Sequence, residues 1–257
     1  FITGKRRNAG KRDWFWNTGA LPGVDQAVRR VDKRTVSEKI GVADMKKKGI
    51  IFDLDGVIVS TDRLHYQAWK KIADKLGIAF DEKKNNRLRG VSRMESLEII
   101  LESYPDRGKI SEEEKSRLAE EKNQYYVELL QMLGRKDIPC EVTETLGYLK
   151  KKGYLLAIGS SSKNAGLILR RTEMTEWFNA IADGNHIQHS KPDPEVFLKA
   201  AEFLKLPPEE CLVVEDAEAG IHAAIAGGME TVGIGDAYYC KEADYHIQKF
   251  DELKNYL

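Results

Sequence analysis

The sequence predicts an α/β protein with a parallel sheet core and an inserted helical cap. Three observations predict this fold class. Short apolar runs alternate with amphipathic stretches beyond residue 138, as is typical of a parallel sheet covered by helices on both faces. Residues 62–137 are instead rich in charge and follow helical periodicity. An apolar run of strand type, GIIFDL at residues 49–54, precedes that helical segment, so the cap is expected to interrupt the core after its first strand.

The individual elements follow from periodicity. After the strand at residues 49–54, apolar residues recur at helical spacing over residues 64–76, and again over 94–101 and 112–133. The helices expected beyond the cap cover residues 142–151, the stretch after Asn164, residues 194–206 and residues 219–227. The strands expected there cover residues 154–160, the vicinity of Ala180, residues 211–216 and residues 230–235. The predicted domains are a core of residues 45–61 and 138–257 and a cap of residues 62–137.

Composition limits the partners. The chain has 257 residues, of which 42% are hydrophobic, and its 41 basic residues balance its 41 acidic ones. Ten basic and five acidic residues fall within residues 1–44, so the remainder is mildly acidic and is not expected to bind nucleic acid. Residues 1–44 show no clear period and are expected to form an appendage outside the fold. The alternative is an arm that holds a partner or nucleic acid through Trp14, Phe15, Trp16 and its basic residues.

Cysteine usage and hydropathy indicate the compartment. The three cysteines, Cys140, Cys211 and Cys240, are far apart and form no C-x-x-C pair, which favours a reduced, cytoplasmic setting over a disulfide framework. No run of about 18 apolar residues occurs, so neither a membrane span nor a membrane partner is predicted.

Polar residues follow the expected strands at four places. They are Asp53 and Asp55, then Ser160 to Asn164, then Ser190 and Lys191, and finally Glu215 and Asp216. Because ligands of an open parallel sheet bind at the carboxyl ends of its strands, these side chains are expected to share one crevice. Gathered carboxylates need a cation, and oxygen ligands favour Mg²⁺. The Ser160 hydroxyl and the Lys191 ammonium suit a phosphoryl group, so the sequence predicts a phosphate site beside a metal.

The paired aspartates suggest a division of labour. If the strand turns at Gly56, the carboxylates of Asp53 and Asp55 can both enter the crevice, one to attack phosphorus and one to move a proton. An aspartate nucleophile gives an aspartyl-phosphate, and general acid–base catalysis contributes about 10²–10⁴ in rate.

Four segments of the sequence resemble, in order, the motifs of the haloacid dehalogenase superfamily of phosphotransferases. They are FDLDGV, GSSSKN, SKPDP and VVEDAEAGIHAA, within residues 49–235. The resemblance implies a haloacid dehalogenase-like, Rossmann-like core. The cap segment RLRGVSRMESLEIIL at residues 87–101, HYQAW at residues 65–69 and the SSKN form of the second motif are similar to β-phosphoglucomutases. That family uses Mg²⁺ to interconvert β-D-glucose 1-phosphate and glucose 6-phosphate through glucose 1,6-bisphosphate.

The resemblance implies a role for each matching residue. Asp53 would be the phosphorylated nucleophile and Asp55 the acid and base. The implied metal ligands are Asp53, the backbone carbonyl of Asp55, Glu215 and Asp216, and the implied phosphate ligands are Ser160 and Lys191. The implied substrate-binding residues are Thr61, His65, Trp69, Arg89, Gly90, Val91, Ser92, Arg93, Ser161, Ser162, Lys163 and Asn164. Ser60 departs from the family pattern, in which many members carry an acidic residue.

Each assignment has a plainer alternative. An Asp-x-Asp pair can be a turn, the Ser160 to Asn164 segment can cap the next helix, and Glu215 and Asp216 can do the same. Lys191 and Arg93 can be surface residues, and His65 can lie on a helix face. The remaining histidines, His186, His189, His222 and His246, are interpreted as structural.

Three functions remain open at this point. The first is the mutase, expected to act as a monomer on a small sugar phosphate. The second is a sugar-phosphate phosphatase on the same scaffold, in which water replaces the sugar hydroxyl. The third is a catalytically silent binding protein, which the intact Asp53 and Asp55 pair disfavours.

Overall fold

A computed structural model describes residues 47–89 and 91–257. Residues 1–46 and Gly90 lie outside the described part, and so do the predicted appendage and its alternative role as an arm. The described residues belong to one compact unit. No helix among them combines the length and the apolar character that a membrane span requires.

The core is a sheet of six parallel strands within the described residues. Their spatial order is β3 (Ala180–Ala182), β2 (Leu155–Gly159), β1 (Gly49–Phe52), β4 (Cys211–Glu215), β5 (Glu230–Gly233) and β6 (Tyr245–His246). The order reverses between β1 and β4, because the chain leaves β3 at one edge and returns to the other side of β1. In such a sheet, ligands bind at the carboxyl ends of the strands beside the reversal. The predicted α/β fold class is confirmed.

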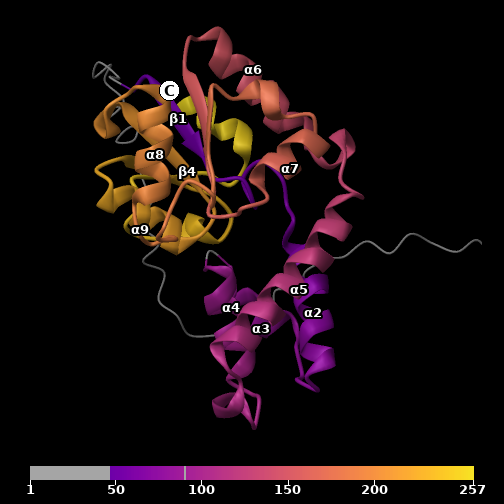
Figure 1. Ribbon diagram of the computed structural model, residues 1–257. Coiled ribbons are helices and arrows are strands. Elements are labelled where there is room, and N and C mark those ends of the chain that lie inside the picture. The colour runs from indigo at the N-terminus through magenta and orange to yellow at the C-terminus, as the bar shows by residue number, and fades with distance from the viewer. Residues whose placement is uncertain (1–46, 90) are drawn as a thin grey trace, which may run out of the picture. The chain divides into compact units, whose positions relative to one another are not determined.

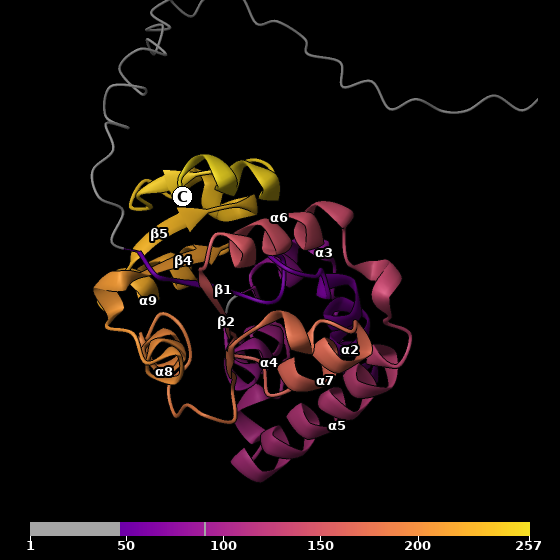
Figure 2. The ribbon, with the colours of Figure 1, turned by 90° about the horizontal axis from the view of Figure 1, so that it is seen from above.

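Helices cover both faces of this sheet (Figure 2). Alternate residues of a strand point to opposite faces, so Ile50 and Phe52 of β1 enter one apolar cluster and Ile51 enters another. The first cluster includes residues of α6 (Cys140–Lys151), α7 (Ala165–Arg171) and the 3₁₀ segment η6 (Phe250–Asn255). The second includes residues of α8 (Glu195–Leu204) and α9 (Glu218–Ala226). Strands buried on both faces explain the continuous apolar runs in the sequence.

The inserted segment forms a separate group of helices. Figure 1 shows α2 (Asp62–Lys75), α3 (Glu82–Asn86), α4 (Arg93–Leu101) and α5 (Glu112–Leu130) together below the sheet. Their apolar faces meet in a cluster of their own, which includes Trp69 and Ile72 of α2, Leu97 of α4 and Leu118 of α5. The helical periodicity that predicted the cap therefore reflects a separate apolar cluster, distinct from the two on the sheet.

Short elements depart from the predictions. Neither α3 nor the two-residue β6 was predicted, and the strand expected over residues 49–54 ends at Phe52. It ends there because a tight turn follows, in which Gly56 has φ of 91° and donates its N–H to the Val59 carbonyl at 2.8 Å. The 3₁₀ segments η1 (Arg107–Lys109), η2 (Arg135–Asp137), η3 (Thr175–Trp177), η4 (Pro208–Glu210) and η5 (Gly235–Tyr239) were not predicted either.

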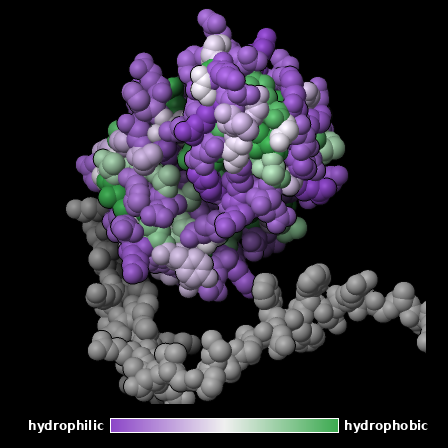
Figure 3. All heavy atoms as spheres, turned by 90° about the horizontal axis from the view of Figure 1, so that it is seen from below, coloured by the Kyte–Doolittle hydropathy of each residue, from purple (hydrophilic) through white to green (hydrophobic). Residues whose placement is uncertain are grey.

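One face of the protein is mostly hydrophilic. Figure 3 shows this face, on which polar side chains predominate and apolar atoms form only small patches between them. Large apolar side chains that are well exposed, such as Met132 and Tyr239, come from different elements. Single exposed apolar residues of this kind are ordinary on a folded protein.

Candidate active site

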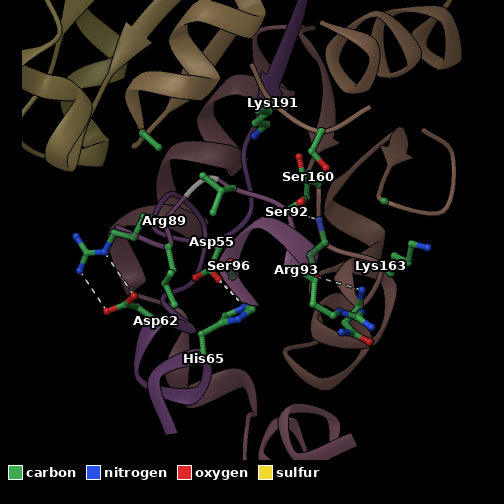
Figure 4. Close-up of a pocket in the computed structure, with 18 of the residues that line it drawn as sticks. Asp55, Asp62, His65, Arg89, Ser92, Arg93, Ser96, Ser160, Lys163 and Lys191 are labelled. Atoms are coloured by element: carbon green, nitrogen blue, oxygen red, sulfur yellow. Dashed lines mark hydrogen bonds and ion pairs between the residues drawn. The ribbon is translucent and has the colours of Figure 1, made fainter. Parts of the chain in front are cut away.

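A cavity of about 720 Å³ lies where the carboxyl ends of the strands face the cap. Core residues from the ends of β1, β2 and β4 line one wall, and residues of α2, α4 and α5 line the other. Side chains from both walls point into it (Figure 4). The crevice predicted from the strand ends is therefore closed over by the inserted helices.

The two aspartates after β1 are held in different ways. The Asp53 N–H donates to the Val214 carbonyl at 2.9 Å and so extends the pairing of β1 with β4. Asp55 accepts the Thr61 N–H at 2.7 Å and also the Thr61 hydroxyl. The Thr61 hydroxyl contacts the Tyr126 hydroxyl at 2.8 Å. Burial raises the pKa of Asp55, and the hydrogen bonds from Thr61 oppose that shift. Asp53 is thus anchored by the sheet, and Asp55 by its own turn and by a tyrosine of the cap.

Lys191 joins the ends of two strands. Its side chain is 4% exposed, and Nζ lies 2.5 Å from Asp53 Oδ1 and 2.6 Å from Glu215 Oε1. Burial alone would lower the pKa of Lys191, but the charges of Asp53 and Glu215 outweigh it and raise the pKa. Burial likewise raises the pKa of Asp53, to about 7, against the opposing ammonium of Lys191. A buried ammonium is therefore fixed beside the Asp53 carboxylate.

Three carboxylates converge beside this lysine. Ligand oxygens of Asp53, Glu215 and Asp216 lie within 4.8 Å of one another. Burial, followed by the charges of Glu215 and Asp53, raises the pKa of Asp216 to about 9. Two glycines make room for the acids: a Cβ on Gly56 would lie 2.0 Å from Asp216 Oδ2, and one on Gly220 would lie 1.9 Å from Glu215 Oε1. The carboxylate oxygens repel one another, and one divalent cation among them would relieve that repulsion. Because all the ligand atoms are oxygens, the cluster fits Mg²⁺.

The loop between β2 and α7 offers hydroxyl and N–H groups to the same space. Ser160 is buried, and its Oγ accepts the Ser162 N–H at 3.2 Å, while Ser162 Oγ accepts the Asn164 N–H at 3.2 Å. These bonds support the turn that precedes α7, although Asn164 itself makes no side-chain cap. The buried Ser161 Oγ has no hydrogen-bond partner among the described residues. Because Ser161 also lines the cavity, a ligand oxygen is a suitable partner for it.

The cap wall is rich in cations held by exposed partners. Arg93 donates to Glu120 Oε2 at 3.1 Å and to Asn123 Oδ1 at 3.0 Å, and Asn123 Oδ1 also accepts from Asn164 of the core at 2.9 Å. These contacts link the cap to the core across the cavity. Arg93 is a cation that an anionic group of a ligand can reach, because its ion pair with Glu120 is partly exposed and such pairs are weak.

Arg89 makes a second link between cap and core. It pairs with Asp62 at 3.2 Å and with Asp236, which follows β5, at 2.7 Å. Arg89, Asp62 and Asp236 all line the cavity. Figure 4 shows the pair of Arg89 with Asp62.

Lys122 is a buried cation that sequence reasoning missed. It is 3% exposed on α5, with Nζ 2.8 Å from His65 Nδ1 and over the rings of Tyr126 and Trp69. Burial, followed by the charge of Arg93, lowers the pKa of Lys122 to about 7. A signal existed in the sequence, because Lys122 follows Leu118 and precedes Tyr126 at the four-residue spacing of the buried stripe of α5.

His65 lies between Lys122 and Asp55. Its Nε2 lies 3.5 Å from Asp55 Oδ2, but burial and then the charge of Lys122 lower its pKa well below the ordinary range. His65 is therefore a neutral imidazole beside Asp55 and does not form an ion pair with it.

The cavity is also lined by residues that were not predicted. They include Tyr126, Asn123, Glu120 and Asp236.

Most of the predicted site residues line this one cavity. They are Asp53, Asp55, His65, Trp69, Arg89, Val91, Ser92, Arg93, Ser160, Ser161, Ser162, Lys163, Asn164, Lys191, Glu215 and Asp216. Gly90 lies outside the described residues. Thr61 is not among the residues that line the cavity, so the geometry gives no support to its implied role in substrate binding. It is fully buried because its hydroxyl and N–H bond to Asp55, while the neighbouring Ser60 lines the cavity in its place.

Fold and site together define a class of protein: a cap-covered parallel sheet with a buried lysine and a cluster of three carboxylates, Asp53, Glu215 and Asp216, that could hold a divalent cation. The family model for haloacid dehalogenase-like hydrolases matches residues 50–234, and the chain belongs to that family.

Relatives within the family differ in what they are named for. The chain is 41% identical to the β-phosphoglucomutase of Bacillus subtilis, covering 80% of this chain and 91% of that protein. It is 33% identical to a phosphorylated carbohydrates phosphatase of Thermotoga maritima, covering 72% and 83%. The crystal structure of β-phosphoglucomutase from Clostridium difficile matches with a TM-score of 0.76 and 41% identity, covering 80% and 93%.

Proposed function

We propose that this protein is a β-phosphoglucomutase, which interconverts β-D-glucose 1-phosphate and glucose 6-phosphate through an aspartyl-phosphate at Asp53 and a glucose 1,6-bisphosphate intermediate. The observation that carries the proposal is a pair of cations on opposite walls of one cavity, Lys191 in the core and Arg93 in the cap. A sugar bisphosphate needs two such positions, because one phosphate is transferred while the other stays remote. The identity to two β-phosphoglucomutases supports the same activity.

The chemistry divides between the paired aspartates. An Asp53 oxygen attacks phosphorus, the bond from phosphorus to the sugar oxygen breaks, and Asp55 gives its proton to that oxygen. In the reverse direction a sugar hydroxyl oxygen attacks the phosphoryl group on Asp53, the bond from phosphorus to the Asp53 oxygen breaks, and Asp55 takes the hydroxyl proton. The raised pKa of Asp55 suits a group that must be protonated in one step and ionised in the next. Thr61 and His65 hold its orientation.

Two core residues hold the group that moves. Lys191 and Ser160 contact the phosphoryl oxygens and supply a fixed charge and a fixed donor where negative charge develops. The side chains of Asp53, Glu215 and Asp216 and the carbonyl of Asp55 would hold Mg²⁺, which offsets the charge of the phosphoryl group when bound.

The cap, residues 62–137 in this proposal, holds the sugar and the remote phosphate. Arg93, with Lys163 and Asn164 from the core, would contact that phosphate, and Arg89, Val91 and Ser92 would border the sugar. Glucose 1,6-bisphosphate serves as both activator and intermediate. We further propose that the enzyme acts as a cytoplasmic monomer.

A second candidate is a sugar-phosphate phosphatase. It is favoured by the 33% identity to the Thermotoga maritima phosphatase and by the fact that the core residues serve both reactions. In a phosphatase, water attacks the aspartyl-phosphate in place of a sugar hydroxyl. The two functions therefore differ in which acceptor the cap admits, and the core chemistry is the same.

One assay separates the two functions. The protein is incubated with β-D-glucose 1-phosphate, Mg²⁺ and a trace of glucose 1,6-bisphosphate, and glucose 6-phosphate and free phosphate are measured together. The mutase predicts that glucose 6-phosphate is the main product and that its formation depends on the bisphosphate. Free phosphate as the main product would favour the phosphatase. Neither product, with substrate still bound, would favour the binding protein.

A further inference from the structure

A group of metal-ligating side chains lies outside the active site. His222 of α9, and Cys240 and Glu242 just after η5, each place one ligand atom within 4.8 Å of the other two. The Cys240 thiol donates to Glu242 Oε2 at 3.4 Å. None of the three lines the active-site cavity. The cluster combines a thiol, an imidazole and a carboxylate, unlike the oxygen-only cluster at the strand ends.

The backbone around this cluster is fixed by packing. Ile221, Ala237, Cys240 and Ala243 form a small buried apolar cluster that holds α9 against the segment after β5. The Cys240 N–H donates to the Ala237 carbonyl at 3.1 Å, and the Cys240 carbonyl accepts from Ala243 at 3.3 Å. His222 follows Ile221 directly on α9. Because these groups are positioned without a ligand, binding costs little ordering of the backbone.

One of the three side chains is buried and two are exposed, so the cluster is open to solvent on one side. Cys240 is buried and forms the floor, while His222 and Glu242 are exposed and form the rim. Glu218, one helical turn before His222, lies 3.9 Å from His222 Nε2 and can orient the imidazole, as carboxylates beside metal-bound histidines do. An ion can therefore approach from solvent and meet all three ligand atoms.

We propose that His222, Cys240 and Glu242 form a second metal site that binds Zn²⁺, with solvent in the fourth position. Zn²⁺ takes thiolate, imidazole and carboxylate ligands in tetrahedral geometry, whereas Mg²⁺ takes oxygen ligands. The thiol proton of Cys240 leaves to solvent as the sulfur–zinc bond forms.

The position of the site gives binding a structural consequence. The ligands tie α9 to the segment after β5, and both segments continue to the acidic wall of the active site. Gly235 and Asp236 of that segment line the active-site cavity, and the Ala237 N–H donates to the Asp216 carbonyl at 2.8 Å. Zn²⁺ bound here stabilises the fold and leaves the catalytic groups in place.

Cobalt substitution tests the proposal directly. The full-length protein is saturated with Mg²⁺ and titrated with Co²⁺, which gives a near-ultraviolet charge-transfer band only when a thiolate is bound. The expected result is one band-forming site per chain, loss of the band in Cys240→Ser, and at least about tenfold weaker Co²⁺ binding in His222→Ala and Glu242→Gln. Zn²⁺ should displace the Co²⁺ and raise the melting temperature of the unmodified protein. Turnover without Zn²⁺ should be unchanged in the two rim variants.

Matched controls come from the same chain. Cys140→Ser removes an exposed cysteine and His189→Ala an exposed histidine, and both variants should keep the band and the affinity. Absence of a band in the unmodified protein would overturn the proposal, as would a band lost in Cys140→Ser. Because His222 and Glu242 are exposed, their variants should fold even if Cys240→Ser does not, and unchanged Co²⁺ binding in both would also overturn it.

Discussion

The two walls of the active-site cavity are built differently. On the core wall, Asp53 and Glu215 are buried, and both form ion pairs with the buried Lys191. On the cap wall, Arg93 and Arg89 come from the helical insertion, are partly exposed and pair with carboxylates that are exposed themselves. Exposed ion pairs contribute about 0–1 kcal/mol, so the cap pairs can open when a ligand arrives. The core pairs cannot be separated without leaving a buried charge.

In the proposed function, this difference assigns the two walls to different tasks. A rigid, charged core fixes the chemistry of phosphoryl transfer, because preorganised charges need no rearrangement when the reaction occurs. An adjustable cap selects the acceptor, because its cations can exchange a protein carboxylate for a ligand phosphate. Core substitutions should therefore abolish the reaction, whereas cap substitutions should change which substrate reacts.

The largest effect is expected from Asp53→Asn. Enzymes must accelerate phosphate-monoester cleavage by up to about 10²¹-fold, so loss of the nucleophile should abolish phosphoenzyme formation and turnover. Asp55→Asn is the matched control, since it alters the neighbouring acid but retains the nucleophile. It should still be phosphorylated and lose about 10²–10⁴ in rate. Labelling with a radioactive phosphoryl donor measures both, and a labelled Asp53→Asn variant would refute the assignment.

Lys191→Ala should destabilise the core wall as well as inactivate it. Removing one partner of a buried charge cluster costs about 3–5 kcal/mol, because the carboxylates of Asp53 and Glu215 are left unpaired. Denaturant unfolding measures the loss. Lys163→Ala, an exposed lysine that lines the same cavity, should change stability by no more than about 0.5 kcal/mol. Equal stability of the two variants would contradict the rigid description of the core wall.

Arg93→Ala tests the adjustable wall. Truncating one member of a charge-assisted pair costs about 2–5 kcal/mol, so use of glucose 1,6-bisphosphate should fall by about 30-fold to several thousand-fold. Phosphorylation of Asp53 by acetyl phosphate, which has no remote phosphate, should be much less affected. Arg87→Ala is the control, because Arg87 lies in the same segment, pairs with Glu102 and does not line the cavity. Equal losses with both donors would mean that Arg93 supports the cap in general.

The smallest effect concerns Lys122 and pH. Burial lowers its pKa from 10.5 in the unfolded chain to about 7, so the protonated form is disfavoured by folding. The cost is fully present below pH 7, falls as pH rises from 7, and is gone above 10.5. Lys122→Met should therefore be more stable than the unmodified protein at pH 6, by up to a few kcal/mol, with the difference shrinking toward pH 10.

The charged and titratable groups facing Lys122 are His65, Arg93, Asp55 and Tyr126. Melting temperatures across this pH range measure the effect, and Lys71→Met serves as a surface control for the loss of a lysine charge, since Lys71 is exposed over Tyr125. A difference that grows with pH would show that the charge of Lys122 is compensated in the fold.

The two walls also differed in how far the sequence could predict them. Core residues such as Asp53, Ser160 and Glu215 follow apolar strands, and the carboxyl ends of parallel strands meet at one edge of the sheet. Their convergence could therefore be predicted from chain order alone. Lys122 meets His65 across 57 positions of sequence, and a charged residue on a helix looks alike whether it faces solvent or a cavity. Whether Lys122 faces solvent or the cavity depends on how α5 is rotated and packed. Periodicity predicts only which residues of α5 share its buried face.

Short elements were missed for a related reason. The five residues of α3, EKKNN, contain no apolar residue, and the two residues of β6 are too few to show alternation. Their formation depends on local caps and on neighbouring strands, such as the Asp81 side chain that accepts the Lys84 N–H. The sequence also could not predict that the Thr61 hydroxyl bonds to Asp55, because that contact depends on the geometry of the turn after Gly56.

The central claim is that the cap directs the phosphoryl group from Asp53 to a sugar hydroxyl and away from water. The most direct test is to phosphorylate Asp53 with labelled acetyl phosphate, add β-D-glucose 1-phosphate in a single turnover, and measure where the label goes. The account predicts that most of the label appears in glucose 1,6-bisphosphate with the unmodified protein, and that Arg93→Ala shifts it toward free phosphate. Release of the label as free phosphate at the same rate with and without the sugar would contradict the account.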